Sequence, residues 1–455
     1  MTKDLTTGSP FKCIVGFATP MFLGMLFQQF YNMVDTMIVG QFLGLNPLAG
    51  VGSTSSLYFL VIGFCNGVCS GFAIPVAQAF GAKDHKSLRR LVANGALLSV
   101  LFAAVITCLT VVFCRPMLSL MNTPGNAYEY AYLYIVIIFA GIPCTFLYNM
   151  TASVIRALGD SRTPVIFLIV SSVLNIVLDL VFILPCQMNV AGAALATVIS
   201  QGVSGLVCLI YAKKKFPILR LEKGEGRPDK FSIVWLCRIG LPMGLQYSIT
   251  AIGTIVVQAA VNAFGEVAVA GVAAAQKISG LLTCPLEALG ATMATYTGQN
   301  MGAGRLDRVS RGLFLSTLSG IVVSAVTLVV VLLFGNQLSL LFISSAEAEA
   351  LDYSFHFLLI SAATYALLTL VLTVRYTIQG MGYSTFAMIA GFLEMAARCF
   401  VGLVLPLWLG FTGVCFSNPA AWIAADLFLI PAFFFCRRRL SRTMPQRSPE
   451  APSAS

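Results

Sequence analysis

The stretch PMFLGMLFQQFYNMVDTMIVGQ, residues 20–41, contains one charged side chain, Asp35, in an otherwise uncharged and mostly apolar run. About 20 apolar residues suffice for a transmembrane helix, so this run is long enough to cross a bilayer. Similar runs recur along the whole chain, which is 58% hydrophobic and only 10% charged. Soluble domains carry about 25% charged residues. Alternation with a period of two residues is absent, which excludes a β-barrel and leaves helices. We therefore expect an all-α polytopic membrane protein.

The apolar runs predict about twelve transmembrane helices. They cover residues 11–42, 48–80, 91–113, 130–154, 165–184, 190–212, 234–264, 267–300, 309–334, 354–374, 386–407 and 413–435. Lysine and arginine gather in alternate connections, at residues 83–90, 156–162, 213–230 and 305–311, at Arg375 and in both tails. The positive-inside rule then places both termini in the cytoplasm and the chain in the cell membrane.

The chain also repeats itself about 221 residues apart. AGVGSTSS at residues 49–56 is similar to AGVAAAQK at 270–277, AQAFGAKDHKSLRR at 77–90 to TGQNMGAGRLDRVSR at 297–311, and IRALGDS at 155–161 to IQGMGYS at 378–384. Each half holds six spans, so the halves share one orientation in the membrane. We predict a six-helix lobe over residues 1–212, a cytoplasmic linker over 213–233, a second six-helix lobe over 234–436 and a cytoplasmic tail over 437–455.

Such a duplicated architecture predicts a transporter with its substrate site between the lobes. The chain has no G-x4-G-K-[ST] phosphate loop, so a coupling ion must supply the energy for uphill transport. No nucleophile–histidine pair or metal-ligand set indicates an enzyme or a cofactor. The 13 cysteines are scattered singly, as reduced packing residues are. The net charge of +10 has no aromatic-interleaved basic face, so nucleic acid is not an expected partner. We expect a monomer in the bilayer.

Ionisable residues inside the spans cost about 2.5–3.5 kcal/mol each and need an explanation. The first span carries a polar stripe that ends in an acid: Gln28, Tyr31, Asn32 and Asp35. Asn175 and Asp179 share a face of the fifth span. Counted from the predicted outer ends, Asp35, Asp179 and Thr197 all lie about 10 Å below the outer boundary. These oxygen groups suit Na⁺ or a proton, and the alternative is a structural polar cluster that holds helices together.

Other polar residues within the spans have less certain roles. Pro20, in the same helix as Asp35, predicts a hinge or a static kink. Glu394 and Arg398, four residues apart, form a neutralising structural pair or a substrate-facing pair. Glu287 is a drug-binding carboxylate or a partner of Lys277. The seventh span has a neutral stripe at Gln246, Thr250, Thr254, Gln258 and Asn262, which faces protein or a water-filled cavity. The role of Asp426 is not predicted.

The stretch at 20–41, the loop at 77–90, RALGDSRTP at 156–164 and TGQNMGAG at 297–304 resemble the multidrug and toxic compound extrusion (MATE) family over nearly the whole chain. The resemblance implies a twelve-helix exporter, driven by Na⁺ or H⁺ antiport, with small organic cations as substrates. Asp35, Asn175, Asp179, Thr197 and Pro20 match the ion site and helix bend of the DinF-like branch. The NorM-like branch has a glutamate on helix seven where Thr250 stands here, so coupling in the first lobe is implied.

The alternatives are a lipid-linked oligosaccharide flippase, a channel and a receptor. A flippase should line its lumen with arginine and lysine for anionic head groups. Away from the ends of the predicted spans only Lys277 and Arg398 carry a positive charge, against five acids, which favours a cationic substrate. A channel would need a ring of like residues from symmetric subunits, and a receptor is not expected to duplicate a six-span unit.

Overall fold

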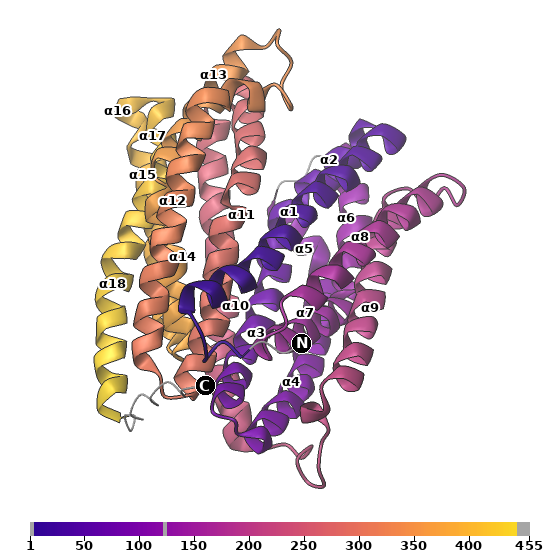
Figure 1. The fold of residues 1–455 in the computed structure, drawn as a ribbon. Coiled ribbons are helices and arrows are strands. Elements are labelled where there is room, and N and C mark those ends of the chain that lie inside the picture. The colour runs from indigo at the N-terminus through magenta and orange to yellow at the C-terminus, as the bar shows by residue number, and fades with distance from the viewer. Residues whose placement is uncertain (1–3, 122–124, 444–455) are drawn as a thin grey trace.

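The computed structural model of the chain describes residues 4–121 and 125–443, and these fold into helices joined by short connections (Figure 1). In chain order the elements are α1 (Pro10–Leu43), α2 (Leu45–Ser53), α3 (Ser55–Gly81), α4 (His85–Val112), α5 (Cys114–Leu120), α6 (Gly125–Ala140), α7 (Ile142–Ala157), α8 (Arg162–Ile183), α9 (Val190–Lys215), the 3-10 helix η1 (Pro217–Leu219), α10 (Lys230–Asn262), α11 (Glu266–Gly302), α12 (Leu306–Ser339), α13 (Ala348–Ala363), α14 (Tyr365–Gly380), α15 (Ser384–Val404), α16 (Pro406–Leu409), α17 (Phe411–Cys415) and α18 (Ser417–Thr443). The described ranges contain no strand, and the predicted all-α class is confirmed.

Two of the membrane spans are broken in the middle. Within the described residues, ten spans are long and apolar enough by length and composition, and the pairs α6–α7 and α13–α14 qualify together, with bends of 48° and 52°. Pro143 in the first turn of α7 removes a backbone donor at the first break. At the second break the Thr364 hydroxyl donates to the carbonyl of Ile360 at 2.9 Å, a contact that bends helices. Counting each pair once gives the predicted twelve spans.

Two predicted span boundaries differ from the observed ones. The run at 48–80 is interrupted at Thr54, whose hydroxyl donates to the Val51 carbonyl, so α2 and α3 are separate helices. The run at 354–374 continues as α14 to Gly380, which places Arg375 inside the helix. Assigning Arg375 to a connection was therefore wrong. A single arginine lowers the local hydropathy, yet nothing in the backbone ends the helix before Gly380.

The helices pack around two large apolar cores, one formed by residues between Ile38 and Leu236 and one by residues between Val257 and Cys436. Each core corresponds to one bundle of helices. The bundles lie closest where α3, α11 and α18 end, and they diverge toward the opposite end of the molecule (Figure 1). We call the end that holds Gly81, Gly302 and Thr443 the termini face.

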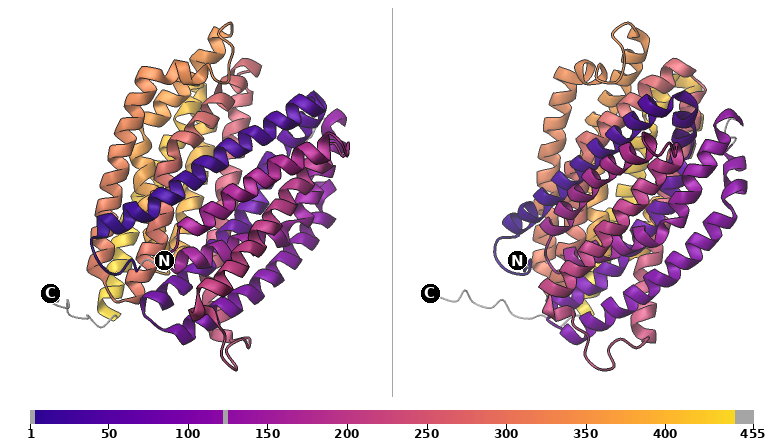
Figure 2. Two further views of the ribbon diagram at one scale, coloured as in Figure 1. Left: turned by 45° about the vertical axis from the view of Figure 1, so that its right-hand side comes forward. Right: turned by 90° about the vertical axis from the view of Figure 1, so that its right-hand side faces the viewer.

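The first helix of each half runs from one bundle to the other. The first part of α1, from Cys13 to Met21, shares a small core with residues 288–296 of α11, whereas Val39 lies in the core of the N-terminal bundle. Figure 2 shows α1 crossing the molecule obliquely between the bundles. In the same way Leu236 of α10 lies in the N-terminal core and Val257 in the C-terminal core. The bundles thus exchange the ends of α1 and α10, an arrangement that the apolar runs of the sequence do not predict.

The segment between α9 and α10 is fastened to α4. The Arg89 guanidinium donates from Nη2 to Glu225 Oε1 at 2.9 Å and pairs with Glu222 at 2.9 Å. The backbone N–H of Asp229 donates to Asn94 Oδ1 at 2.9 Å. The hydrogen bond from Arg89 lowers the pKa of Glu225 to about 2. The predicted linker therefore packs on the N-terminal bundle.

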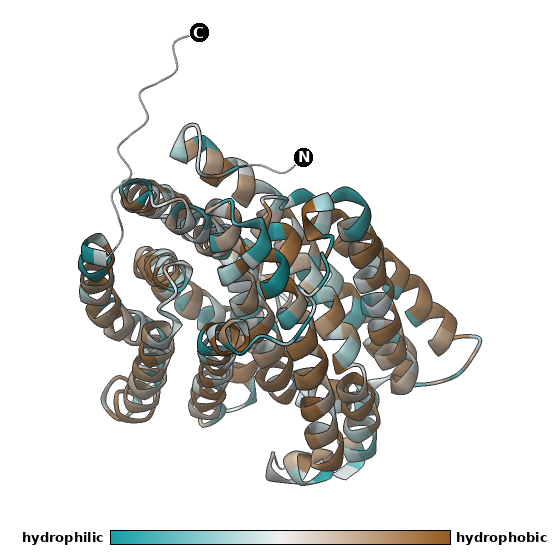
Figure 3. Ribbon diagram, turned by 90° about the horizontal axis from the view of Figure 1, so that it is seen from below, coloured by the Kyte–Doolittle hydropathy of each residue, from teal (hydrophilic) through white to brown (hydrophobic). Residues whose placement is uncertain are grey.

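The outer surface of the helices is apolar. Exposed side chains include Val100 on α4, Phe314 on α12, Phe400 on α15 and Leu427 on α18, each more than half exposed. Seen from the termini face, the outer helices are largely hydrophobic along their length (Figure 3). So much exposed apolar surface requires a lipid environment, and the chain is a multi-span membrane protein.

Candidate functional site

Two carboxyl groups face each other inside the N-terminal bundle. Asp35 on α1 and Asp179 on α8 lie close enough to share a hydrogen bond. Asn175, one turn before Asp179, directs its amide nitrogen at Asp179 Oδ1 at 3.5 Å. Both Asn175 and Asp179 are buried. We call Asp35 and Asp179 the acidic pair.

The predicted threonine lies in the same place and reaches the acidic pair through a tyrosine. The Tyr31 hydroxyl lies next to the side chain of Thr197 on α9 and close to both aspartates. The Thr197 hydroxyl itself donates to the Ala193 carbonyl at 3.1 Å. The structure therefore brings Asp35, Asn175, Asp179 and Thr197 together, as their predicted depths require. Tyr31 belongs to this cluster, while Gln28 and Asn32 on the same helix are exposed.

The acidic pair has no balancing cation. In the part of the chain that the structure describes, neither aspartate forms an ion pair with a lysine or arginine. Asp35 Oδ1 and Asp179 Oδ2 are buried and accept no hydrogen bond from a described residue. Two carboxylates this close repel unless one holds a proton or a cation lies between them. The carboxylates, the amide and the hydroxyl are hard oxygen donors, so the site fits H⁺ or Na⁺.

Pro20 lies in the part of α1 that packs on the C-terminal bundle. Its neighbour Met21 is buried against α11, and one turn further on Gly24 lies against Val165 of α8, with no room for a Cβ atom. The helix is continuous through Pro20. The proline, which removes one backbone hydrogen bond, therefore stands where α1 passes from one bundle to the other, about 22 Å along the helix from Asp35.

The predicted polar stripe on α10 faces protein at its start. Gln246 is buried and accepts a hydrogen bond from Gln379 Nε2 of α14 at 2.6 Å. The Thr250 hydroxyl donates to the Gln246 carbonyl at 3.0 Å, within the helix. Farther along, Gln258 Nε2 donates to Asn262 Oδ1 at 3.0 Å. Gln246 is therefore engaged by a neighbouring helix in this conformation.

Glu287 lies near the middle of α11, two residues after Pro285, and is exposed. It interacts electrostatically with Tyr247 of α10 and Tyr376 of α14, whose hydroxyls lie 3.1 Å apart. Glu287 therefore faces these interior helices. The alternative partner, Lys277, is ten residues away, about 15 Å along the helix. The Lys277 ammonium instead lies over the Phe342 ring, 5.6 Å from its centre.

The C-terminal bundle holds a cluster of four charged residues: Arg375 on α14, Glu394 and Arg398 on α15, and Asp426 on α18. All four are at most 6% exposed. Glu394 accepts a hydrogen bond from Arg375 Nη2, and its other oxygen lies 3.7 Å from Arg398 Nη1. Arg398 Nε also donates to Asn418 Oδ1 at 3.2 Å. The predicted Glu394–Arg398 pair is therefore part of a larger buried cluster.

Asp426 completes the charge balance of this cluster. It interacts electrostatically with Arg375 and Glu394, but neither of its oxygens accepts a hydrogen bond within residues 4–121 and 125–443. The two arginines and two acids sum to zero formal charge. We call these four residues the balanced cluster.

The two bundles are joined at the termini face by matching hydrogen bonds. Gln78 Nε2 on α3 donates to the Gly380 carbonyl, and Gln299 Nε2 on α11 donates to the Ala157 carbonyl, both at 2.8 Å. One turn beyond each glutamine, a Cβ atom on Gly81 or Gly302 would overlap the backbone of the opposite helix. This face of the molecule is closed in the present conformation.

The start of the chain is bound at the same place. The Leu5 N–H donates to Gln299 Oε1 at 3.0 Å, and the Leu5 side chain is fully buried. The Arg308 guanidinium donates to the carbonyls of Leu5 at 3.2 Å and Gly8 at 2.8 Å. Gln299 thus links the N-terminal segment, α11 and the end of α7.

The sequence model of the MatE family matches the chain twice, over residues 20–181 and 242–404, which together exceed half of its length. The chain belongs to the MatE family. It is similar to "Probable multidrug resistance protein YoeA" of Bacillus subtilis, with 29% identity over 95% of both chains. It is 31% identical to "Probable multidrug resistance protein YpnP" of the same organism, over 76% of this chain and 78% of that protein.

The fold of this MatE-family chain is also that of solved structures. "Outward-facing conformation of a multidrug resistance MATE family transporter of the MOP superfamily" matches it with a TM-score of 0.88 and 23% identity, over 96% of this chain and 98% of that one. The two family matches begin at Pro20 and Pro242, which are the prolines inside α1 and α10. The predicted MATE resemblance is confirmed, and the chain is a membrane transporter for small molecules rather than an enzyme.

Sequence reasoning missed three polar residues that organise this MatE-family structure. The sequence predicts Arg375 in a connection between two spans. Gln78 and Gln299 lie in the repeated motifs, where the sequence predicts no role for them. For Gln78 and Gln299 the repeat itself was a signal, because the two glutamines stand at equivalent positions of the two halves. Each of them bonds to the end of an equivalent helix.

Proposed function

We propose that this transporter exports small organic cations in exchange for H⁺ or Na⁺, with the acidic pair as the coupling site. The unbalanced charge of Asp35 and Asp179 carries this proposal. Two facing carboxylates without a lysine or arginine bind a cation or a proton strongly. The site lies between α1 and α8, and α1 is the helix that also contacts the C-terminal bundle. Ion binding at the pair can therefore act on the contact between the bundles.

The proposal includes an orientation and a state. The basic connections and the basic end of α18 lie at the termini face, which supports a cytoplasmic position for that face by the positive-inside rule. The hydrogen bonds of Gln78 and Gln299 close the termini face, so the proposed conformation is the one that opens on the opposite side. In the proposed cycle the outward-facing form takes up the ion, and the inward-facing form releases it and accepts substrate.

The proposed mechanism uses α1 as the moving part. An ion at Asp35 and Asp179 neutralises the pair, so the polar stripe of α1 loses less solvation free energy when it leaves water. The helix then bends near Pro20, where it leaves the C-terminal bundle. One H⁺ or Na⁺ moving in for one monovalent organic cation moving out transfers no net charge, so the ion's concentration gradient is the driving force. A tenfold ion gradient, about 1.4 kcal/mol, sustains about a tenfold substrate gradient. Coupling requires that ion and substrate prefer different states.

Acidic side chains favour a cationic substrate. Glu287 faces the interior helices next to the Tyr247–Tyr376 hydroxyl pair and has no basic partner among the described residues. The buried arginines of the C-terminal bundle are already paired through Glu394. Anionic cargo of the flippase type would therefore find no free buried cation in that bundle.

The test measures flux of a fluorescent organic cation in vesicles that contain the purified protein. A Na⁺ gradient and a pH gradient are imposed separately on wild type, Asp35→Asn and Asp352→Asn. Asp352 is exposed on α13 and serves as the matched control. We expect one gradient to drive transport in wild type and Asp352→Asn, and neither to drive it in Asp35→Asn. Folded wild type that transports under neither gradient would overturn the proposal and lead to tests of lipid-linked cargo.

A further inference from the structure

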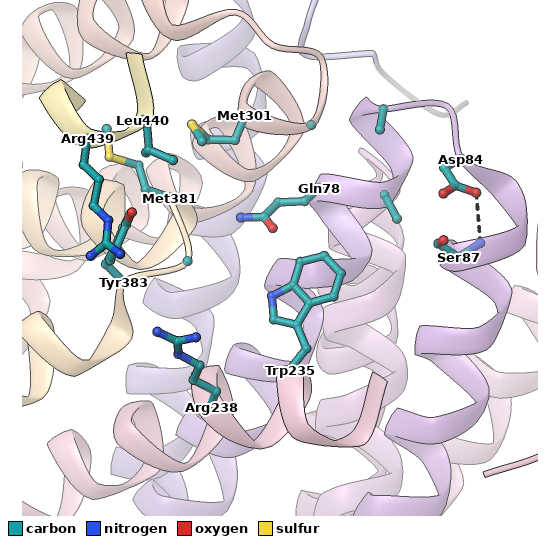
Figure 4. Close-up of a pocket in the computed structure, with 14 residues that line it drawn as sticks. Gln78, Asp84, Ser87, Trp235, Arg238, Met301, Met381, Tyr383, Arg439 and Leu440 are labelled. Atoms are coloured by element: carbon teal, nitrogen blue, oxygen red, sulfur yellow. Dashed lines mark hydrogen bonds between the residues drawn. The ribbon is translucent and has the colours of Figure 1, made fainter. Parts of the chain in front are cut away.

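The termini face contains a pocket that the transport mechanism does not use. Its volume is about 540 Å³, and it is lined by residues of both bundles. Gln78 of α3 forms one wall, Trp235 and Arg238 of α10 a second, and Tyr383 and Arg439 of the C-terminal bundle a third. Figure 4 shows the two arginines on the same side of the pocket as Tyr383, with the Trp235 ring beside them.

The two arginines are free to bind an anion. Neither the Arg238 nor the Arg439 guanidinium has a hydrogen-bond or ion-pair partner among the residues that the structure describes. The one acid of the lining, Asp84, lies at the far edge (Figure 4) and accepts a hydrogen bond from the Ser87 N–H as the cap of α4. Hydrogen bonding to Ser87 lowers the pKa of Asp84, and the carboxylate is engaged at the start of α4. The lining residues therefore carry a net positive charge, on side chains suited to a phosphate.

The rest of the lining is mostly apolar, and exposed apolar side chains lie on the same helices. Met301, Met381 and Leu440 contribute to its wall together with the Trp235 ring. On the outside of the same helices, Phe231 is 73% exposed and Phe435 54% exposed. A ligand for this pocket needs an anionic group for the arginines and apolar atoms for the wall. Phosphate esters that carry an apolar part meet both needs.

We propose that this pocket binds a phosphate ester, from an anionic phospholipid or from a soluble organic phosphate, and that the bound ester holds the termini face closed. Arg238 belongs to the part of α10 that packs on the N-terminal bundle, whereas Arg439 is on α18 of the C-terminal bundle. Gln78, whose hydrogen bond to Gly380 joins the bundles, lines the same pocket. The pocket therefore exists only while the bundles touch here, and a ligand that prefers this state shifts the population toward it.

The effect on transport rests on the proposed function, but the binding does not. If the termini face is cytoplasmic, as proposed, the ligand stabilises the outward-facing state. The cytoplasmic leaflet carries anionic lipids, and basic pockets between transmembrane helices bind their head groups. Binding can be measured without an ion gradient or a transported substrate, so a failed transport test would leave this result intact.

The experiment counts lipids retained by the purified full-length protein in native mass spectrometry, after reconstitution in phosphatidylcholine with or without phosphatidylglycerol. Wild type is compared with Arg238→Gln/Arg439→Gln. The control is Arg437→Gln/Arg438→Gln, which removes the same charge from exposed positions on α18 that do not line the pocket. We expect wild type and the control to retain phosphatidylglycerol, and the pocket variant to bind it about tenfold more weakly per arginine lost. Equal retention by all three proteins would overturn the proposal.

A second arm separates the two sources of the ester and tests the consequence. Glycerol 3-phosphate is added to protein in phosphatidylcholine alone, and spin labels on α4 and α12 report the distance across the termini face. Closure by phosphatidylglycerol only identifies a lipid site, and closure by glycerol 3-phosphate identifies a soluble ligand. In both cases Arg238→Gln/Arg439→Gln should not respond. If neither compound changes this distance in wild type, the ligand does not hold the termini face closed and this part of the proposal is refuted.

Discussion

The acidic pair of the N-terminal bundle and the balanced cluster of the C-terminal bundle use related helices for opposite purposes. Asp35 and Asp179 stand on α1 and α8, and α8 corresponds by repeat order to α15, which carries Glu394 and Arg398. The N-terminal site has two acids and no cation, while the C-terminal site has two acids and two arginines. In the proposed function the first gains and loses a cation during the cycle, whereas the formal charges of the second sum to zero.

The comparison teaches that the two halves bury acids in a different charge balance, because only the acids of the C-terminal bundle have arginines beside them in the described residues. A buried charge without a partner costs several kcal/mol, so it persists only where the cost is part of function. A balanced set of buried charges needs no ion from outside. We therefore expect variants at the balanced cluster to change stability, and variants at the acidic pair to change transport.

The largest effect is expected from breaking the balanced cluster. Arg375→Met leaves Glu394 without its closest partner and should lower the free energy of unfolding by about 3–5 kcal/mol. Arg375→Met/Glu394→Met, which removes one charge of each sign and keeps the formal charge of the cluster at zero, should recover part of that loss. Chemical unfolding in mixed micelles measures both.

The same measurement on Asp35→Asn sharpens the comparison. Removing one of two facing carboxylates relieves repulsion, so Asp35→Asn should unfold no more easily than wild type. A loss as large as that of Arg375→Met would show that the acidic pair is itself a structural cluster.

The next effect is on transport. Asp179→Asn should reduce ion-driven flux by up to about 150-fold, the upper range of a typical coupling free energy. Asp426→Asn, in the balanced cluster, should keep its dependence on the ion gradient. Vesicle flux under the gradient that drives wild type measures both variants. Loss of coupling in Asp426→Asn, with coupling retained in Asp179→Asn, would reverse the roles of the two clusters.

A smaller effect should follow from separating the bundles. Gly302→Ala places a methyl group against the Gln78 carbonyl, so the termini face cannot close as it does here. Overpacking of this kind costs about 1–3 kcal/mol, which shifts the equilibrium away from the closed form by about 5- to 150-fold. Distances between spin labels on α4 and α12 report the shift. Gly52→Ala, at a glycine of α2 where an added Cβ atom meets no atom within 4 Å, controls for the loss of a glycine.

The sequence predicted the features that depend on local composition. Long apolar runs gave the twelve spans, and the family model matches the chain once before and once after the charged stretch at its middle. The depths of Asp35, Asp179 and Thr197 were enough to bring them together, because a helix converts residue number into distance along the membrane normal.

Features that depend on how helices pack against one another were not predictable in this way. The exchange of α1 and α10 between bundles is set by which apolar side chains meet, and neither helix has one distinct apolar face that marks its partner. Arg375 looked like the end of a span because its partner, Glu394, lies on another helix. The hydrogen bonds of Gln78 and Gln299 end on backbone carbonyls, which no sequence motif marks.

The smallest expected effect separates the acidic pair from surface charges. Glu225 has a pKa of about 2 in the folded chain, against 4.5 without its partners, because Arg89 hydrogen-bonds to it. Its folded pKa is lowered, so the stabilisation is fully present above about pH 4.5 and is lost as the pH falls toward 2. Glu225→Gln should flatten the stability curve in this window, though not completely, since the pKa values of Asp84 and Asp229 are also lowered. If Glu225→Gln leaves the stability curve unchanged, the contact with Arg89 is not the source of the pH dependence in this window. Any pH dependence above 4.5 that Glu225→Gln retains and Asp35→Asn loses must then arise at the acidic pair.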